Sequence, residues 1–187
     1  MELFKYFKEK CHADAFCKGS IRFALQTYYR NIEDIDKSDE LEGVAVSNYN
    51  GIEKTINNYA QSNAMILCVS TDINKFLKYK HGNFVVRINC CETFNEALSA
   101  SCYYRENGIG KNISNNLVTY DKGTFNREAD FNDTVFQKPK QHCNEREYRF
   151  LFYDRKYAEV SISCKLDPFA FLELDRNLSK TLFEKLY

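Results

Sequence analysis

Two glutamates, Glu145 and Glu147, are the residues whose type and spacing best suit acid–base chemistry. They lie in the segment EREYRFLFYD, where Tyr148, Phe150 and Phe152 recur at every second position, a pattern typical of a strand with one buried face. Residues two apart on a strand share a face, so one carboxylate can stabilise a developing cation while the other removes a proton nearby. Their proximity also predicts a raised pKa for one of them, which suits a general base. The alternative is that both acids pair with the arginines of the same segment.

Ser70 and Thr71 end the near-continuous apolar run AMILCVST, which predicts a buried strand over residues 64–71. Hydroxyl groups at the end of such a strand can orient a ribose or an amide. Such residues more often finish a strand and lead into a helix. We expect Asp72 to cap that helix, which runs through Tyr79.

Two arginines, Arg22 and Arg30, suit the recognition of phosphate groups. Arg22 stands between the apolar residues Ile21 and Phe23 in SIRFAL, so a strand there directs its side chain away from the core face. Arg30 follows in YYRNIED. The segment 33–42, EDIDKSDELE, carries too much like charge to pack, and we expect a solvated loop or the rim of a site. A salt bridge to this acidic loop is an equal alternative for either arginine.

The common motifs of nucleotide and metal sites are missing from the sequence. It contains neither a GxxxxGK phosphate loop nor GxGxxG, and its three histidines are scattered. No two of its eight cysteines have the CxxC spacing of a zinc site or a redox motif. Cys143 is adjacent to His142, but neighbours on a strand face opposite ways and cannot form a nucleophile–base pair. We therefore expect no metal ion, and reduced cysteines within the core.

Length and composition predict one globular domain over residues 1–187. Apolar residues make up 44% of the chain, with only 2 prolines and 7 glycines, which excludes disordered and collagen-like proteins. Phe and Tyr supply the aromatic residues and predict a phenylalanine-rich core. The 26 basic and 26 acidic residues balance, so we expect no charge-driven coating of nucleic acid. The sequence shows neither a secretory signal nor a long apolar segment, so we expect a soluble, cytoplasmic protein without membrane contact.

Two periodicities predict the elements that must position these residues. Alternation and short apolar runs predict strands at 20–25, 64–71, 83–89, 117–120, 145–154, 158–163 and 171–175. Helical spacing predicts helices from Phe4 to Gly19, over 52–59, over 72–79, across Phe94, Leu98 and Cys102, and from Leu178 to Leu186. The segments 106–116 and 121–134 have the composition of loops. Without a regular βαβ rhythm we expect an α+β fold, a mostly antiparallel or split sheet with helices on one side.

Four stretches of the chain occur in a distinctive order and together span most of residues 16–153: FCKGSIRFAL, YYRNIEDIDKSDELEG, ILCVSTD and FQKPKQHCNEREYRFLF. In this order they resemble a widespread family of uncharacterised bacterial and phage proteins. This resemblance implies no mechanism.

A second likeness concerns the order of the candidate residues. The chain has Arg22 first, then Ser70 and Thr71, and then the pair Glu145 and Glu147. This order resembles the Arg-Ser-Glu pattern of ADP-ribosyltransferases, although Asp72 stands at the third position of the family's Ser-Thr-Ser motif. The likeness implies that NAD is the cofactor. It implies that Arg22 binds the pyrophosphate and that Ser70 positions the ribose. We expect Thr71 and Arg30 to bind the cofactor as well. Glu147 would hold the 2′-hydroxyl of the nicotinamide ribose and stabilise the oxocarbenium ion, and Glu145 would activate the acceptor.

The leading hypothesis is therefore an NAD-dependent ADP-ribosyltransferase or NAD glycohydrolase of a bacterial or phage conflict system, as a toxin, defence or anti-defence protein. Its acceptor, protein or nucleic acid, stays open. One alternative is a non-catalytic inhibitor or sensor that binds its partner through the acidic loop 33–42. Another is a metal-dependent nuclease whose carboxylates, Asp39, Glu42, Glu145 and Glu147, hold Mg²⁺.

Overall fold

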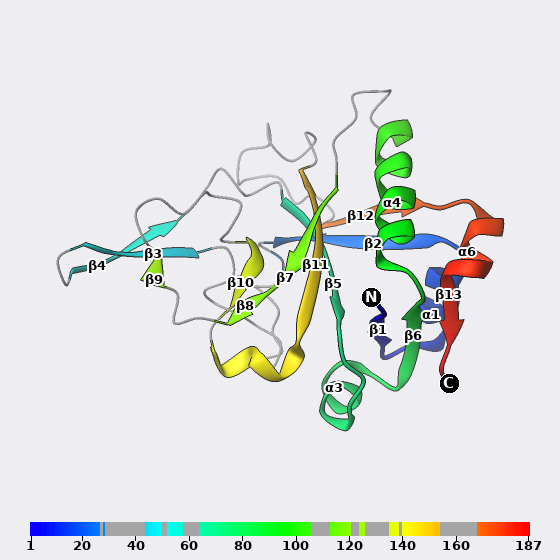
Figure 1. Ribbon diagram of the computed structural model, residues 1–187, viewed down its shortest axis with the longest axis horizontal. Helices are drawn as coiled ribbons and strands as arrows, with labels where there is room; N and C mark the ends of the chain where they lie inside the picture. Colours follow the sequence, from blue (N-terminus) through cyan, green and yellow to red (C-terminus); the bar gives the residue numbers. More distant parts are fainter. Residues whose placement is uncertain are drawn as a thin grey trace.

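The main sheet of the protein has eight strands, with helices packed on it (Figure 1). The computed structural model describes residues 1–26, 28, 44–49, 52–57, 64–105, 113–120, 124–125, 135–138, 140–153 and 168–187. The elements are β1 (Leu3–Phe7), α1 (Lys10–Cys17), β2 (Ser20–Leu25), β3 (Val44–Tyr49), β4 (Ile52–Asn57), β5 (Ala64–Ser70), α3 (Lys75–His81), β6 (Phe84–Ile88), α4 (Cys91–Arg105), β7 (Ser114–Leu117), β8 (Thr119–Tyr120), β9 (Thr124–Phe125), β10 (Gln137–Lys138), the 3-10 helix η3 (Lys140–Glu145), β11 (Glu147–Tyr153), β12 (Phe169–Glu173), α6 (Arg176–Leu182) and β13 (Phe183–Lys185).

Strand β5 is the centre of the main sheet because it has three neighbouring strands. β11 pairs with it along its whole length, with Glu147 opposite Ser70. The other edge of β5 is divided, since β2 pairs with its first half and β1 meets it only at Ser70. The sheet therefore splits between β1 and β2, beside Cys68. All pairings of this sheet are antiparallel, which confirms the predicted α+β fold with a split sheet.

Two small sheets complete the described strands. β3 pairs antiparallel with β4 and parallel with β9, and Figure 1 shows these three strands at a distance from the main sheet. β8 pairs in parallel with β10, which places Lys138 opposite Tyr120. The β8–β10 pair lies beside β11 and delivers two side chains to the site described below.

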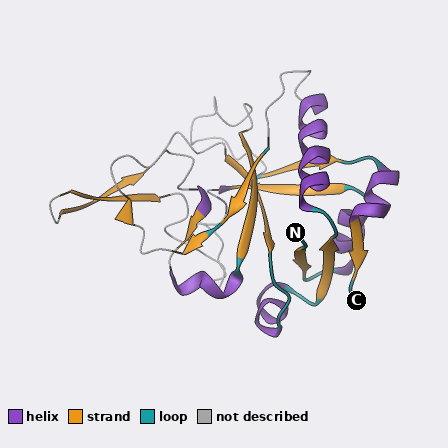
Figure 2. Cartoon of the chain, viewed as in Figure 1, coloured by secondary structure: helices purple, strands orange, loops and turns teal. Residues whose placement is uncertain are grey.

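One face of the main sheet carries the largest apolar core, and α1, α4 and α6 contribute side chains to it. Figure 2 shows helices in purple beside the strands of the sheet, near the two marked ends of the chain. Phe94 of α4 is fully buried, and the centre of its ring lies 5.1 Å from that of Phe150 and 5.6 Å from that of Phe183. Phe23 and Phe152 make a further edge-to-face pair at 4.9 Å. Such edge-to-face contacts are the favoured geometry for aromatic pairs. The predicted phenylalanine-rich core is confirmed.

The opposite face of the sheet is covered in part by α3. Leu77 of this helix is 1% exposed and packs with Phe4, Tyr6 and Val85, whose side chains leave their strands on the face away from the main core. Helices therefore flank both faces, and the expectation of helices on one side is wrong. The part of this face that α3 leaves open contains the candidate site.

Alternation and short apolar runs predicted several strands of the main sheet. The strands expected at 20–25, 64–71 and 83–89 are β2, β5 and β6, and the EREYRF strand is β11. In β2, Ile21 and Phe23 are fully buried while Arg22 is exposed, as the alternation predicts. The helix expected across Phe94, Leu98 and Cys102 is α4, and all three side chains are fully buried.

Three expected helices are wrong in whole or in part. Residues 3–7 form a strand, because β1 pairs with β6 at all five of its positions, and the helix begins only at Lys10. Residues 52–57 form β4 rather than a helix, and the chain after Leu182 forms β13 rather than continuing α6. Residues four apart share a face in a strand as well as in a helix, so apolar spacing alone did not separate the two.

Smaller differences concern element ends. The helix expected to be capped by Asp72 begins at Lys75, because the side chain of Asn74 accepts the hydrogen bond from the Leu77 amide at 2.9 Å. β7 occupies 114–117 and so takes up the end of the expected loop 106–116. Of the strand expected at 117–120, β8 covers only 119–120, and the strand expected at 171–175 is β12, two residues earlier. The expected strand 158–163 and the acidic loop 33–42 lie outside the described residues.

The described cysteines are free thiols in different environments. Cys91 and Cys102 are buried, as expected, but Cys11 and Cys143 are exposed. Within the described part of the chain, the structure has no helix with the length and apolar character needed to cross a membrane.

Gly82, which follows α3, fixes the turn that brings this helix against β1. Its φ is +120°, and a β-carbon there would lie 2.1 Å from the carbonyl oxygen of Phe7. We expect Gly82→Ala to lower the free energy of unfolding by about 2–3 kcal/mol, because the backbone conformation and the contact both exclude a side chain. Urea unfolding measures this, with the exposed neighbour Asn83→Ala as control. Equal stability of the two variants would contradict this account of the turn.

Candidate functional site

A cavity of about 580 Å³ opens where the main sheet splits. Its walls come from β1, β2, β5, β11 and β12, and from α1, α3, β10 and η3. Its volume is in the range of sites that hold cofactors and other small ligands. The sheet thus provides a hollow at the one place where β5 lacks a continuous neighbour on its second edge.

The structure brings most of the predicted site residues to this cavity. Arg22, Ser70, Glu145 and Glu147, which come from three distant parts of the sequence, all line it. Thr71 is not among the lining residues, because its hydroxyl donates to the carbonyl of Arg146 at 3.2 Å on the outside of the turn. Arg30 lies outside the described residues. Four residues that were chosen for their order in the sequence therefore line one cavity.

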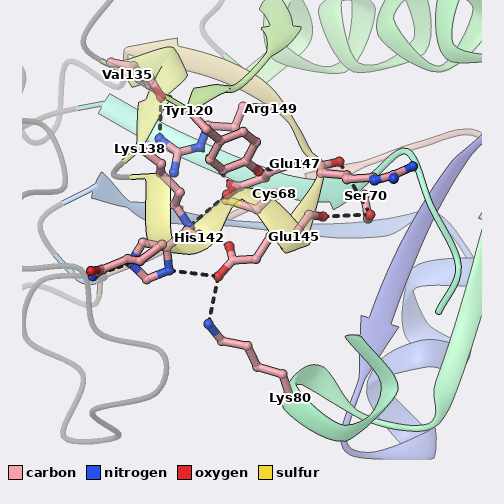
Figure 3. Close-up of polar contacts among 12 residues, drawn as sticks. Cys68, Ser70, Lys80, Tyr120, Val135, Lys138, His142, Glu145, Glu147 and Arg149 are labelled. Carbon is pink, nitrogen blue, oxygen red and sulfur yellow. Dashed lines mark hydrogen bonds and ion pairs between the residues drawn. The ribbon is translucent and has the colours of Figure 1, made fainter. Parts of the chain in front are cut away.

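Glu147 is the first residue of β11 and is 4% exposed. The Nε atom of Arg149, itself 1% exposed, donates to its Oε1 at 2.8 Å, and the Nζ atom of Lys138 lies 2.8 Å from Oε2 (Figure 3). Its backbone N–H donates to the hydroxyl of Tyr120 at 2.7 Å. Two cations and a fixed backbone therefore hold this carboxylate at the cavity wall, as an ionised group.

Glu145 reaches the same place from a different element. It ends η3 instead of lying on β11, so the expectation of two glutamates on one strand face is wrong. Its Oε1 lies 2.7 Å from Nζ of Lys80 and 3.1 Å from Nδ1 of His142, and its Oε2 accepts from Lys138 at 2.9 Å (Figure 3). Lys138 thus bridges the two carboxylates.

The residue between the two glutamates makes this arrangement possible. Arg146 has a φ of +44°, in the left-handed region that few residues other than glycine adopt. The amide of Thr71 donates to the Arg146 carbonyl at 2.9 Å, and Ser70 Oγ donates to the Glu145 carbonyl at 2.9 Å. The end of β5 therefore fixes the turn that brings both acidic side chains to Lys138.

The ionisation of the two glutamates differs from the sequence expectation of one raised pKa. Burial raises the pKa of Glu147, but the charges of Arg149 and Lys138 outweigh it and lower the pKa to about 2. Burial likewise raises the pKa of Glu145, and the His142 hydrogen bond with the charges of Lys138 and Lys80 brings it well below its ordinary value. Both groups are anions at neutral pH, so neither is a strong general base there.

The low pKa of Glu147 predicts a pH dependence of stability. A carboxyl group whose folded pKa is depressed contributes stability above its ordinary pKa of 4.5, and this contribution is lost as the pH falls toward about 2. We expect the melting temperature to fall below about pH 5, and to fall less steeply in Glu147→Gln. Thermal melting followed by circular dichroism measures both curves. Parallel curves for the two proteins would show that Glu147 does not contribute.

Sequence reasoning missed the lysines of the site. Lys5 of β1 donates from Nζ to the carbonyl of Cys68 at 2.7 Å, so it occupies the split in the sheet where that acceptor lacks a strand partner. Burial lowers its pKa. The signal available in the sequence was a lysine at the centre of the aromatic strand LFKYF, but its use depends on the split itself.

The charge of the cavity is positive although that of the chain is zero. Five lysine or arginine side chains and three glutamates line it. Arg22 is exposed, and its guanidinium lies 4.6 Å from the centre of the Phe169 ring. The second aromatic ring on this strand, Phe171, is 50% exposed. Cations and aromatic rings together suit a ligand that carries phosphate groups and a planar base.

Two further lining residues stay uncharged at neutral pH. Burial and the charge of Glu147 raise the pKa of the Cys68 thiol to about 12, so it is not a thiolate nucleophile. Burial lowers the pKa of His81 to about 4, so its imidazole is neutral.

The residues that the structure describes include no group of three His, Cys, Asp or Glu side chains placed to hold a metal ion. Asp39 and Glu42 of the nuclease hypothesis, and the acidic loop of the binding hypothesis, lie outside those residues. Comparison of the chain with models of protein families, with curated proteins and with solved structures found no match.

Proposed function

We propose that the protein cleaves the nicotinamide–ribose bond of NAD, as an ADP-ribosyltransferase or an NAD glycohydrolase. The observation that carries the proposal is the convergence of Arg22, Ser70 and Glu147 on one cavity. If the motifs were similar by chance, the three residues would have no reason to lie near one another. Catalysis requires that they line the same cavity. The setting in a bacterial or phage conflict rests on resemblance alone and stays a prediction.

The charges of the cavity suit the parts of NAD. Arg22, with Lys5 at the neighbouring split, supplies positive charge for the pyrophosphate. Phe171, which is exposed and lies opposite Arg22 across the β2–β12 pair, offers a ring face for a base. Glu147 lies beyond Ser70 and faces the nicotinamide ribose in this arrangement. Each carboxylate oxygen has a second lone pair, so the ion pairs of Glu147 leave it able to accept a ribose hydroxyl.

The proposed reaction uses the Glu147 carboxylate, which lies near the bond that breaks and stabilises the cation formed on the ribose. The bond between C1′ of the ribose and the nicotinamide nitrogen breaks, and its electron pair leaves with neutral nicotinamide. The ribose becomes an oxocarbenium ion, which the ionised Glu147 stabilises. Water or another acceptor then bonds to C1′ and becomes strongly acidic, so even the weakly basic Glu145 can take its proton. Water as acceptor gives ADP-ribose, nicotinamide and a proton.

Arg22→Met tests the ligand assignment, because methionine keeps the length of the side chain without its charge. We expect the KM for NAD to rise about tenfold or more with a smaller change in kcat, since a contact to the pyrophosphate is the same before and in the transition state. Nicotinamide release measured against NAD concentration gives both constants. Lys18→Met is the control, as an exposed cation that does not line the cavity. An unchanged KM for NAD in Arg22→Met would show that Arg22 does not contact the bound NAD.

A further inference from the structure

Helix α3 presents aromatic and basic side chains together on the surface. Phe76 is 47% and Tyr79 is 89% exposed, and Ile73 just before the helix is 40% exposed. These three residues are spaced three apart, so they follow one side of the short helix. Exposed apolar side chains that lie next to one another, with polar residues around them, mark a candidate binding surface.

The charge of the same surface has one sign. The segment 73–83, INKFLKYKHGN, contains three lysines and no acidic residue. Lys75 is exposed and Lys78 is half-buried. In the sequence Phe76 lies between Lys75 and Lys78, and Tyr79 lies between Lys78 and Lys80. An anionic partner with flat rings matches this pattern of cations between aromatic side chains.

The surface extends from α3 onto η3 and reaches the cavity between them. Lys80 of α3 and Glu145 of η3 form an ion pair at 2.7 Å, and Arg146 lies 3.6 Å from Asp72. Arg146 is 66% exposed and Lys140, at the start of η3, is also exposed. Figure 3 shows Lys80 reaching from α3 to Glu145, and both residues line the cavity, so the α3–η3 surface and the cavity wall share this ion pair.

We propose that α3 and η3 form a docking surface for single-stranded nucleic acid, which supplies the acceptor of ADP-ribose. The transfer of ADP-ribose to the nucleic acid rests on the proposed function, whereas the binding of the nucleic acid does not. Phe76 and Tyr79 stack on bases, while Lys75, Lys78, Lys140 and Arg146 contact phosphates. The zero net charge of the chain is compatible with this, because the positive charge is local.

The transfer balances without any further reactant. A nitrogen or oxygen of the bound nucleotide bonds to C1′ of the oxocarbenium ion after nicotinamide has left with the electron pair of the broken bond. The proton of the attacking group passes to Glu145 and then to solvent. The products are the ADP-ribosylated nucleic acid, nicotinamide and one proton.

Fluorescence anisotropy with labelled 12-nucleotide DNA and RNA of one mixed sequence tests the docking surface. We expect both to bind, because stacking and phosphate contacts use groups that DNA and RNA share. Phe76→Ala/Tyr79→Ala and Lys75→Glu/Lys78→Glu are each expected to weaken binding about tenfold or more, and the lysine pair also lowers the salt dependence of binding. The matched charge-reversal control is Arg176→Glu/Lys180→Glu on the exposed side of α6, and Leu117→Ala controls for an exposed apolar side chain. Thermal melting establishes that each variant is folded.

Several results would overturn the docking surface. One is an unchanged anisotropy of the labelled oligonucleotide up to about 100 µM protein at low salt. Another is equal binding by the α3 variants and their controls. Displacement of the oligonucleotide by poly-L-glutamate at equal charge concentration would assign the surface to an acidic protein instead. Glu147→Gln separates the two proposals, because we expect it to bind the oligonucleotide as the unmodified protein does while it loses nicotinamide release. If the unmodified protein binds the oligonucleotide but does not cleave NAD, the docking surface is supported and the proposed enzymatic activity is contradicted.

Discussion

Glu147→Gln is expected to lower kcat for nicotinamide release by about 10²- to 10³-fold, while the affinity for NAD changes only a few-fold. Glutamine keeps the size and the hydrogen-bonding reach of the side chain but removes the negative charge. The charge matters only when the ribose becomes a cation, so the loss falls on kcat rather than on binding. Initial rates of nicotinamide release and calorimetric titration of NAD measure the two effects.

The matched control for this variant is Glu96→Gln on the exposed side of α4, which makes the same chemical change away from the cavity. Assays are run well below the melting temperature of each variant, because removal of a buried carboxylate also weakens the fold. Full activity of a folded Glu147→Gln protein would show that the carboxylate serves stability alone.

Arg149→Met is expected to have the largest effect on stability, a loss of about 3–5 kcal/mol in the free energy of unfolding. Arg149 is 1% exposed and pairs with Glu147, and it also donates to the carbonyl of Val135. Its loss leaves a buried carboxylate with one cation fewer and a buried acceptor without this donor. Urea unfolding measures the change.

The control is Arg146→Met, three residues away in the same segment. Arg146 is 66% exposed and its partner Asp72 lies at 3.6 Å, so we expect a loss of at most about 1 kcal/mol. In the double variant Glu147→Gln/Arg149→Met, we expect a loss smaller than the sum of the two single losses, because each single variant leaves one partner uncompensated. Strictly additive losses would mean that the two side chains do not depend on each other.

Alternation predicted the parts of the fold where one strand face is buried. Ile21 and Phe23 around Arg22, and Tyr148, Phe150 and Phe152 in β11, have a period that only a strand satisfies. Where apolar residues recur four apart, as at residues 52 and 56, strand and helix fit equally well, and the pairing of β3 with β4 decided the outcome. Local sequence could not supply that pairing.

The two glutamates, Ser70 and Arg22 of the candidate site were predictable from the sequence, and its lysines were not. Glu145, Glu147, Ser70 and Arg22 are marked by motif order, but the positive φ of Arg146 that ends η3 ahead of β11 has no signal in the sequence. Lys5, Lys80 and Lys138 reach the cavity only because the sheet splits, because α3 packs on β1 and because β10 lies beside β11. These contacts are tertiary, and they reverse the expected direction of the glutamate pKa shift.

The most direct test of the account is the time course of nicotinamide release from NAD by the purified protein, with and without single-stranded oligonucleotide. The account predicts release beyond one nicotinamide per protein molecule, and none above background from Glu147→Gln on the same timescale. Intact NAD after prolonged incubation with the folded protein under both conditions would contradict it.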